Sequence, residues 1–580
     1  MRRASAFVAL LVLTLLLAGC TGVPQSSSPE VVRTVGLGGG EQAASTVTPK
    51  PGVQPESLVR TFLGLNAVDA GKHASARTFL TPAARSRWTD TTVTVVSSLT
   101  VGAYTPGKPI IVNATQLGSV DATGVYTPVT ATGKAAVEQF SFGIAKVGTQ
   151  YRINSLNSGL LLTESQFSAS FVPRSVYFFD LAHGYLVPDA RWTPDTDPID
   201  TSETLVNLLA GAPSKGLQNA VSNDTLPAQS GTRHIDVTGT NLVKIEIPGA
   251  SQLASTDKDL LAAQIAATLG DVDRGRSLQI TDGGSAVSIP DSGSTEFTAS
   301  DFRDTMVVPP QPELYYIRRG QIVDEKRQLL GGPLNSGRYP LTSLAVSRSG
   351  PGGNLSVAGV TGSAASARLV MGSQGDELRR TSVVGVTSRP AFAPGRVEAW
   401  VGAGTRVYRA TLLSDSRIVA SPVSLPAPVA GQTVVALRLS PEGSRIALVL
   451  LDRTGHKQLW TGDVVRTATS VSITSLQQIS PDDVMVTDLA WIEGERLNAI
   501  GYDRATQEPH VYRTGADGSA WTTYPITGLP AAPASLAGAP GAPAYAAADA
   551  NVYEQSRGIP WSYLGGGSTP ALGSAPAYVE

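Results

Sequence analysis

The sequence has very few residues that could crosslink the chain or bind a transition metal. Its 580 residues include one cysteine, Cys20, and five histidines. One cysteine cannot form an intrachain disulfide, so the fold cannot depend on disulfides. No histidine lies at metal-ligand spacing from another, which argues against a zinc site. We predict no cofactor. The five histidines are His73, His183, His234, His456 and His510.

The chain also lacks a strong excess of charge. Its net charge is −2, so nothing in its composition indicates a nucleic-acid partner. Charged residues make up 16% and apolar residues 42%, which is typical of globular rather than disordered chains. A chain of this length is expected to form three or four domains.

The only long apolar run lies at the beginning of the chain. Arg2 and Arg3 precede an apolar stretch over residues 7–17, which is too short to span a bilayer comfortably. The sequence Leu-Ala-Gly-Cys follows at 17–20 and resembles the bacterial lipobox. It predicts a signal peptide over 1–19, cleaved between Gly19 and Cys20. The alternative is an ordinary signal peptide followed by an incidental cysteine.

Cleavage before Cys20 would leave this residue as a lipid anchor. We expect a diacylglyceryl group on its thiol, whose two acyl chains meet the need of stable anchoring for more than one, and a palmitoyl group on its amine as a third. The predicted location is the extracytoplasmic face of the cell membrane, with lipid bound through Cys20. Residues 20–52 are rich in Ser, Thr, Pro and Gly and are predicted to be a disordered tether.

Two α+β domains are predicted next. In residues 53–168, helical patterns over 55–70, 74–79 and 82–88 precede alternating strands, which indicates a curved roll of the cystatin-like type. In residues 169–305, a hairpin turning at His183-Gly184 precedes a helix over 201–211. A second helix is expected over 257–269, with a capping box formed by Thr256 and Asp259 and an end at Gly270.

Residues 306–580 differ because they contain internal repeats and no convincing helix. Five segments each contain an apolar strand, a turn and a second apolar strand, with turns spaced about 47 residues apart. This spacing predicts a β-propeller of about five to seven blades, with 313–323 supplying a further blade closed by the C-terminal strand. A two-sheet sandwich is the alternative. The turns are centred near Ser349, Pro394, Pro441, Glu493 and Pro540.

No catalytic constellation is evident. Glu398, Asp488 and Glu495 could serve as acids at a propeller mouth, but loops of any propeller carry such residues. The acidic positions 195, 197 and 200 lack the glycine and distal glutamate of a calcium loop. Residues 211–216 and 36–40 lack the context of a phosphate or dinucleotide loop. Four tryptophans that recur about once per repeat are interpreted as packing residues: Trp400, Trp460, Trp491 and Trp521.

The order of these segments resembles the LpqB family of actinobacterial lipoproteins. The similarity is carried by the lipobox and by residues 151–180, 185–192, 208–221 and 260–269; the middle unit resembles the GerMN domain. The resemblance implies a non-enzymatic accessory protein that binds the extracytoplasmic part of the MtrB sensor histidine kinase, in the MtrA–MtrB two-component system, and influences envelope homeostasis and division.

The residues themselves indicate only a tethered binding protein of unknown oligomeric state. The alternative hypothesis is a cell-envelope glycan-binding protein or hydrolase that uses the propeller mouth.

Overall fold

The computed structural model of the chain describes residues 47–68, 73–129, 137–227, 235–239, 241–273, 275–305, 312–467, 469–556, 560–565 and 569–580. Val47–Glu580 forms one compact unit, and all the described hydrophobic cores lie inside it. Gly19, Cys20 and most of the predicted tether are outside the described residues. Within the described ranges, no helix has the length and apolarity needed to cross a membrane.

The first part of the compact unit begins with three short helices, where the sequence predicts them. They are α2 (Pro55–Leu65), α3 (Ala74–Thr78) and α4 (Pro82–Arg87). Leu58, Phe62 and Leu63 face inward from α2, and the Phe62 ring meets Trp88 edge-on at 5.5 Å between centroids. Each such side chain gains roughly 1.5–3 kcal/mol from leaving water, so this apolar stripe fixes α2 on the sheet.

A six-stranded sheet carries these helices. Its strands are β1 (Val93–Val101), β2 (Ile110–Val120), β3 (Tyr126–Pro128), β4 (Val137–Val147), β5 (Gln150–Ser155) and β6 (Leu160–Thr163). They run in the order β5-β4-β2-β1-β6, with β3 on β2, and only β1 and β6 are parallel. Strand β6 and the helix α5 (Glu164–Ser170) after it were not predicted from the sequence.

The second part begins with the predicted hairpin. Strands β7 (Phe171–Asp180) and β8 (Leu186–Pro194) pair along their whole length. At the turn, the Asp180 carboxylate accepts hydrogen bonds from the N–H groups of Gly184 and Tyr185, at 2.6 and 2.9 Å. His183 takes a left-handed φ of 54° there, an uncommon conformation that the Asp180 contacts hold in place.

Two helices and a four-stranded sheet complete this part. Helix α6 (Pro198–Ala210) begins three residues before the predicted start, because Asp197 caps it by accepting the N–H groups of Ile199 and Asp200. Helix α7 (Ser255–Asp273) connects two parallel strands. The sheet contains β10 (Val237–Thr238), β11 (Leu242–Glu246), β12 (Ser277–Asp282) and β13 (Ser285–Ala286), and β9 (Val221–Ser222) pairs with β7.

The predicted boundaries of α7 were wrong at both ends. The helix begins at Ser255, so Thr256 lies inside its first turn and cannot be the N-cap. The Asp259 carboxylate accepts the N–H of Asp291 at 2.8 Å instead of closing a capping box. Gly270 does not end the helix, which continues to Asp273, where the carboxylate accepts a hydrogen bond from buried Ser202. Contacts distant in sequence therefore set these ends.

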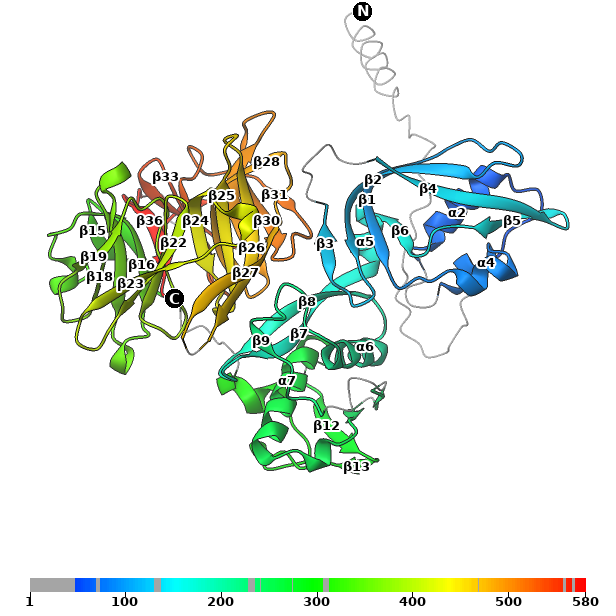
Figure 1. Cartoon of the computed structure of the whole chain (residues 1–580), viewed down its shortest axis with the longest axis horizontal. Helices are drawn as coiled ribbons and strands as arrows, with labels where there is room; N and C mark the ends of the chain where they lie inside the picture. The colour runs from blue at the N-terminus through cyan, green and yellow to red at the C-terminus, as the bar shows by residue number, and fades with distance from the viewer. Residues whose placement is uncertain are drawn as a thin grey trace, which may run out of the picture. The chain divides into compact units, whose positions relative to one another are not determined.

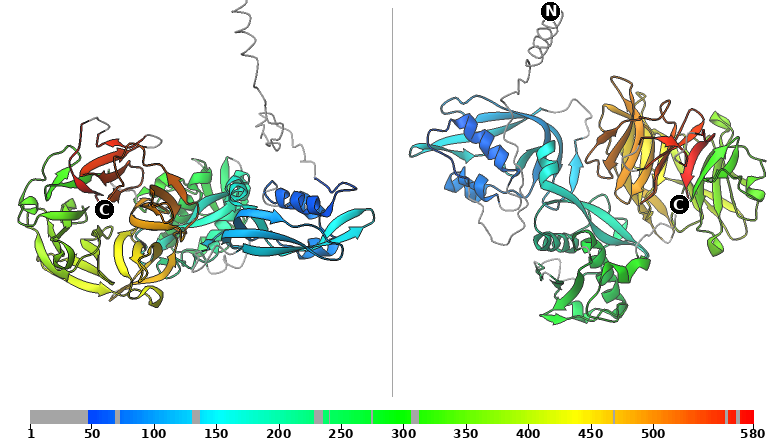
Figure 2. Two further views of the ribbon diagram at one scale, coloured as in Figure 1. Left: turned by 90° about the horizontal axis from the view of Figure 1, so that it is seen from above. Right: turned by 180° about the vertical axis from the view of Figure 1, so that it is seen from behind.

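The third part is a β-propeller (Figures 1 and 2). Within the described residues it has six sheets: five of four strands and one of three. The four-stranded sheets are β16 (Leu341–Ser347) to β19 (Arg379–Val384), β20 (Ala391–Phe392) to β23 (Ile418–Val423), β24 (Thr433–Leu439) to β27 (Val471–Gln478), β28 (Val484–Glu493) to β31 (Thr522–Tyr524), and β32 (Ser535–Ala537) to β35 (Ser562–Tyr563).

The strands between these are β17 (Ser356–Thr361), β18 (Arg368–Ser373), β21 (Glu398–Ala403), β22 (Arg406–Leu412), β25 (Arg445–Leu451), β26 (Lys457–Arg466), β29 (Arg496–Asp503), β30 (Pro509–Gly515), β33 (Ala544–Ala548) and β34 (Asn551–Gln555). The five repeats predicted from the sequence correspond to the first two strands of the five four-stranded sheets.

The sixth sheet closes the ring with strands from both ends of the propeller sequence. Strand β14 (Leu314–Arg318) pairs with β15 (Gln321–Asp324) on one side and with β36 (Ser574–Tyr578) on the other. Beyond β36, the N–H of Glu580 donates to the carbonyl of Val346 in β16 at 2.8 Å. The chain therefore ends in the middle of the ring, as the left view of Figure 2 shows, and the predicted closing strand is confirmed.

One carboxylate is buried within the propeller at high cost. Asp463 on β26 is completely buried, and neither of its oxygens makes a hydrogen bond of ordinary geometry to another described residue. It pairs across the sheet with Arg445 on β25. Burial raises the pKa of Asp463 to about 7, and Arg445 offsets only part of this effect.

We expect Asp463→Asn to stabilise the protein at high pH. An acid with a raised folded-state pKa destabilises the fold progressively as pH rises from its unfolded pKa, near 4, to its folded pKa, near 7. Because one pKa unit corresponds to about 1.4 kcal/mol, the gain at pH 8 is at most about 4 kcal/mol and fades below pH 5. Melting temperatures measured from pH 4.5 to 8 test this. The control, Asp415→Asn, removes an exposed carboxylate and should change little; equal pH profiles for wild type and Asp463→Asn would contradict the prediction.

Ring closure predicts a large effect at Tyr578. Its ring is buried against Tyr545, and its hydroxyl donates to the carbonyl of Pro543 at 2.8 Å. Tyr578→Ala should cost about 3–5 kcal/mol of unfolding free energy, as for other buried aromatic truncations. Tyr578→Phe should cost only about 1 kcal/mol, the hydrogen bond alone. Urea denaturation measures both, and similar losses for the two variants would show that the ring does not anchor β36.

Candidate functional site

A cavity of about 670 Å³ lies in the middle of the propeller. It lies where the inner strands of all six sheets end, and four of the five repeated turns predicted from the sequence line it, through Ser349, Pro394, Pro441 and Pro540. Tyr185, from the turn between β7 and β8, lines it as well. Its size is within the range of small-molecule sites, roughly 300–1,000 Å³.

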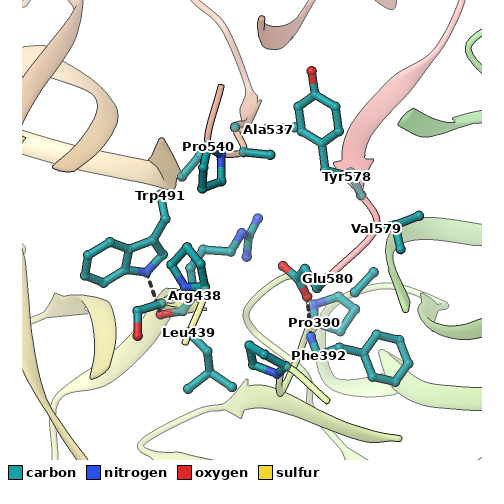
Figure 3. A pocket seen from close by; sticks show the side chains of 18 of the residues that line it. Pro390, Phe392, Arg438, Leu439, Trp491, Ala537, Pro540, Tyr578, Val579 and Glu580 are labelled. Carbon is teal, nitrogen blue, oxygen red and sulfur yellow. Dashed lines mark hydrogen bonds between the residues drawn. The ribbon is translucent and has the colours of Figure 1, made fainter. Parts of the chain in front are cut away.

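The walls of the cavity are mostly apolar (Figure 3). Carbon-rich side chains come from different sheets, so no single strand forms the site. They include Pro390, Phe392, Leu439, Trp491 and Val579. The indole N–H of Trp491 donates to the carbonyl of Arg438 at 3.3 Å, which leaves only carbon on the exposed part of its ring.

Two guanidinium groups face this apolar space. Arg389 donates from Nη1 to Asp488 and to the carbonyl of Leu536, both at 2.9 Å, and from Nη2 to the carbonyl of Pro576. Asp488 also accepts the N–H of Leu536 at 2.9 Å. Burial lowers the pKa of Arg389 to about 10, which still leaves it charged at neutral pH.

Arg438 is less completely paired than Arg389. Its Nη1 donates to the carbonyl of Leu437 at 2.6 Å, while its Nη2 lies 3.6 Å from Asp488, beyond hydrogen-bonding distance. Only 7% of the residue is exposed. A guanidinium has five N–H donors, so Arg438 presents donor capacity to the cavity that its described neighbours do not use.

Glu580 is the one acidic side chain on the cavity wall. Its carboxylate accepts the N–H of Phe392 (Figure 3). The residue is accessible because it borders the cavity, yet protein surrounds it, and this burial raises its pKa to about 7 against the opposing effects of Arg438 and Arg389. Arg348 at the rim is bound to Glu313 at 2.7 Å, so Arg389 and Arg438 are the cations of the wall that act on Glu580.

The three acids considered from the sequence do not form a catalytic pair. Glu398 accepts hydrogen bonds from Trp400, Arg409 and Arg466 at 2.8–2.9 Å. Asp488 is bound to Arg389, and Glu495 accepts a hydrogen bond from the hydroxyl of Ser175. Each carboxylate is therefore committed to a different set of partners.

The tryptophans have the packing role expected for them, with one addition. Trp400 is fully buried in a core cluster, and the indole N–H of Trp521 donates to the carbonyl of Ile479 at 2.8 Å. Trp460 packs against the same cluster as Trp400. Trp491 is also buried in a core cluster, but it lines the cavity too, which the sequence did not indicate.

The remaining sequence candidates that the structure describes form no site. No group of three His, Cys, Asp or Glu side chains able to hold a metal was found in the described ranges. Asp197 and Asp200 belong to the start of α6, and residues 211–216 form the turn after it, where the N–H of Ser214 donates to Asp189 at 2.8 Å. His234 and residues 36–40 lie outside the described residues.

Sequence reasoning missed the arginines of the cavity. The available signal is a charged residue within an otherwise apolar inner strand, as in residues 436–439 around Arg438. Nothing local distinguishes such a residue from a salt-bridged core arginine. Arg389, Arg438 and Glu580 lie up to 191 residues apart in the sequence (580 − 389), and only the closed ring brings them to one cavity.

Comparison with known proteins covers all three parts of the compact unit. Residues 48–168 match the family described as Lipoprotein LpqB, N-terminal domain, and residues 321–578 match the Lipoprotein LpqB beta-propeller domain. Residues 175–288 match a domain described as Sporulation and spore germination, which is the GerMN-type domain expected there.

Relatives and solved structures are similar over large parts of the chain. Lipoprotein LpqB of Mycobacterium tuberculosis is 26% identical, covering 88% of this chain and 92% of the relative. Lipoprotein LpqB of Rhodococcus jostii is 26% identical, covering 75% and 74%. The structure of TolB from Acinetobacter baumannii covers 48% of this chain and 70% of its own, with 13% identity and a TM-score of 0.33, too low to bear on function.

Two family models specific to LpqB lipoproteins thus match on either side of the middle domain, and the curated relatives span most of the chain. The chain belongs to the LpqB family of lipoproteins.

Proposed function

We propose that this protein is a lipid-anchored accessory protein that binds the extracytoplasmic part of a sensor histidine kinase of the MtrB type. Through that contact it adjusts signalling by the MtrA–MtrB system and so influences envelope homeostasis and division. The observation that carries the proposal is the match of both LpqB-specific models, in order, behind a lipobox.

The anchor is part of the same proposal. Cys20 would carry the diacylglyceryl and palmitoyl groups, after cleavage behind Gly19, and hold the protein on the outer face of the cell membrane. A tether of about 30 residues keeps the compact unit close to membrane-embedded partners, which raises its effective concentration for them.

A role in binding, rather than catalysis, is supported by how the acidic residues are used. A hydrolase of glycans needs two carboxyl groups flanking one bond. The three acids considered for that task are bound to Arg409 and Arg466, to Arg389, and to Ser175. The described contacts therefore favour the accessory function over an envelope hydrolase.

The anchor predicts a specific chemical result. Cys20→Ala should abolish incorporation of radiolabelled palmitate, because the variant lacks the only thiol in the chain. Thr21→Ala, which leaves the lipobox intact, is the matched control and should be labelled like wild type. Palmitate labelling of Cys20→Ala would refute the anchor, and this readout is independent of whether an uncleaved signal holds the variant in the membrane.

The partner is tested by photocrosslinking in intact cells. A photoreactive phenylalanine analogue is placed at one exposed position in each part: Val147, Leu181 or Val419. At least one position should trap the kinase, and deletion of the gene should change the phosphorylation of the response regulator. Substitution at buried Val449 is the control and should trap no partner. If no exposed position recovers the kinase and phosphorylation is unchanged by the deletion, the proposal fails.

A further inference from the structure

The central cavity of the propeller has no role in the proposed contact with a kinase. It combines a volume of about 670 Å³, apolar walls and a buried charged side chain, Arg438, that borders the space. Pockets of this kind, with a few fixed polar groups among carbon surfaces, are typical of small-molecule sites. We infer that this cavity is a binding site for an amphipathic organic anion, with an acidic head group and an apolar body.

Arg438 would bind the head group. Only 7% of it is exposed, yet it lies 3.6 Å from the nearest Asp488 oxygen, and it donates a hydrogen bond to the carbonyl of Leu437. A buried guanidinium with unused donors is costly. An oxyanion in the cavity would supply the missing acceptors in the planar, two-point geometry that arginine favours.

Arg389 supports this assignment without sharing the contact. Arg389 donates to Oδ2 of Asp488 at 2.9 Å, while Arg438 lies 3.6 Å from Oδ1, too far for a hydrogen bond. Two guanidiniums thus compete for one carboxylate below the cavity wall. The second positive charge is available to a ligand that enters from the cavity.

Glu580 does not cancel this positive field. One of its oxygens accepts the N–H of Phe392, and it shares the cavity with Arg438. Burial by the surrounding protein raises the pKa of Glu580 to about 7 against the opposing effects of Arg438 and Arg389, which makes its neutral form easier to reach than that of an ordinary glutamate. Its remaining charge weakens anion binding, and its neutral form can donate a hydrogen bond to the head group.

The body of the ligand is defined by the walls. Pro394, Pro441 and Pro540 stand at the ends of three inner strands, and Trp491 and Phe392 add aromatic surface. Proline and aromatic side chains offer few groups that could bond to sugar hydroxyls. The walls therefore favour an aliphatic or aromatic body over a glycan.

The test uses 1-anilinonaphthalene-8-sulfonate as the anionic probe and N-phenyl-1-naphthylamine, which has the same rings without the sulfonate, as its neutral match. The protein is residues 47–580, the compact unit that contains every described core. Fluorescence titration should give one saturable site for the sulfonate and at least about tenfold weaker binding of the neutral probe, the usual effect of losing a charge-assisted hydrogen bond.

Three variants locate the site. Arg438→Gln should weaken binding of the sulfonate probe about tenfold and leave binding of the neutral probe unchanged. Glu580→Gln should strengthen binding of the sulfonate probe severalfold. Ala539→Phe, which fills the cavity from a half-buried turn position, should abolish binding of both probes. Arg513→Gln, a half-buried arginine on the outer strand β30 bonded to Tyr524, is the control and should bind like wild type.

The outcomes separate the possibilities. Equal binding of both probes, or sulfonate binding unaffected by Arg438→Gln in a variant with a wild-type melting curve, would overturn the anion assignment. Binding that survives Ala539→Phe would place the probe elsewhere and overturn the site. If Arg438→Gln does not fold, the opposite effects expected for Glu580→Gln and Ala539→Phe still decide the question. None of these results depends on whether a kinase is bound.

Discussion

The pairing of β14 with β36 is the constraint on which the propeller depends. Five of the six sheets are each built from one continuous stretch of chain, but the sixth takes two strands from the start of the propeller sequence and one from its end. Antiparallel pairing to β14 satisfies the backbone groups of β36, and its residues 577 and 578 pack into the cores of the neighbouring sheets. Without this pairing, the inner edge of the ring is open between β32 and β16.

The same closing strand completes the cavity. Pro576 accepts a hydrogen bond from Arg389, and Glu580 is fixed both to Val346 on β16 and to Phe392 on β20. Ring closure therefore gives hydrogen-bond partners to polar and charged groups whose burial would otherwise be costly. Backbone carbonyl groups, as well as Asp488, hold Arg389 and Arg438 in place. For this reason one carboxylate can accompany two cations.

Much of the fold could be predicted from the sequence because its signals are local. The 47-residue period, the apolar strand pairs and the turn residues around Pro394 or Pro441 repeat within short windows, and the closing strand follows from the need to avoid an open edge. The ends of the helices were harder to predict from the sequence. Asp197 was seen as part of a loop, and the end of α7 depends on Ser202, 71 residues away, so no local window contains the information.

The site was less predictable than the fold. Its apolar walls come in part from turns that the repeat analysis did find, but the cavity exists only because the inner strands of six sheets meet around one axis. Arg389, Arg438 and Glu580 have no shared spacing that would associate them. The lipobox is the opposite case, since four adjacent residues carry its whole signal, and the lipid anchor at Cys20 stays a prediction from the sequence alone.

The shared sheet also determines how the propeller responds to force. The backbone enters the domain at β14, which lies between β15 and β36, so a pull from the residues before β14 acts first on this blade. Antiparallel neighbours on both sides hold β14 through backbone hydrogen bonds, so the load reaches the other five blades only after passing through this sheet. Any force between residues that precede β14 and a partner held by those five blades would therefore be carried by this one sheet.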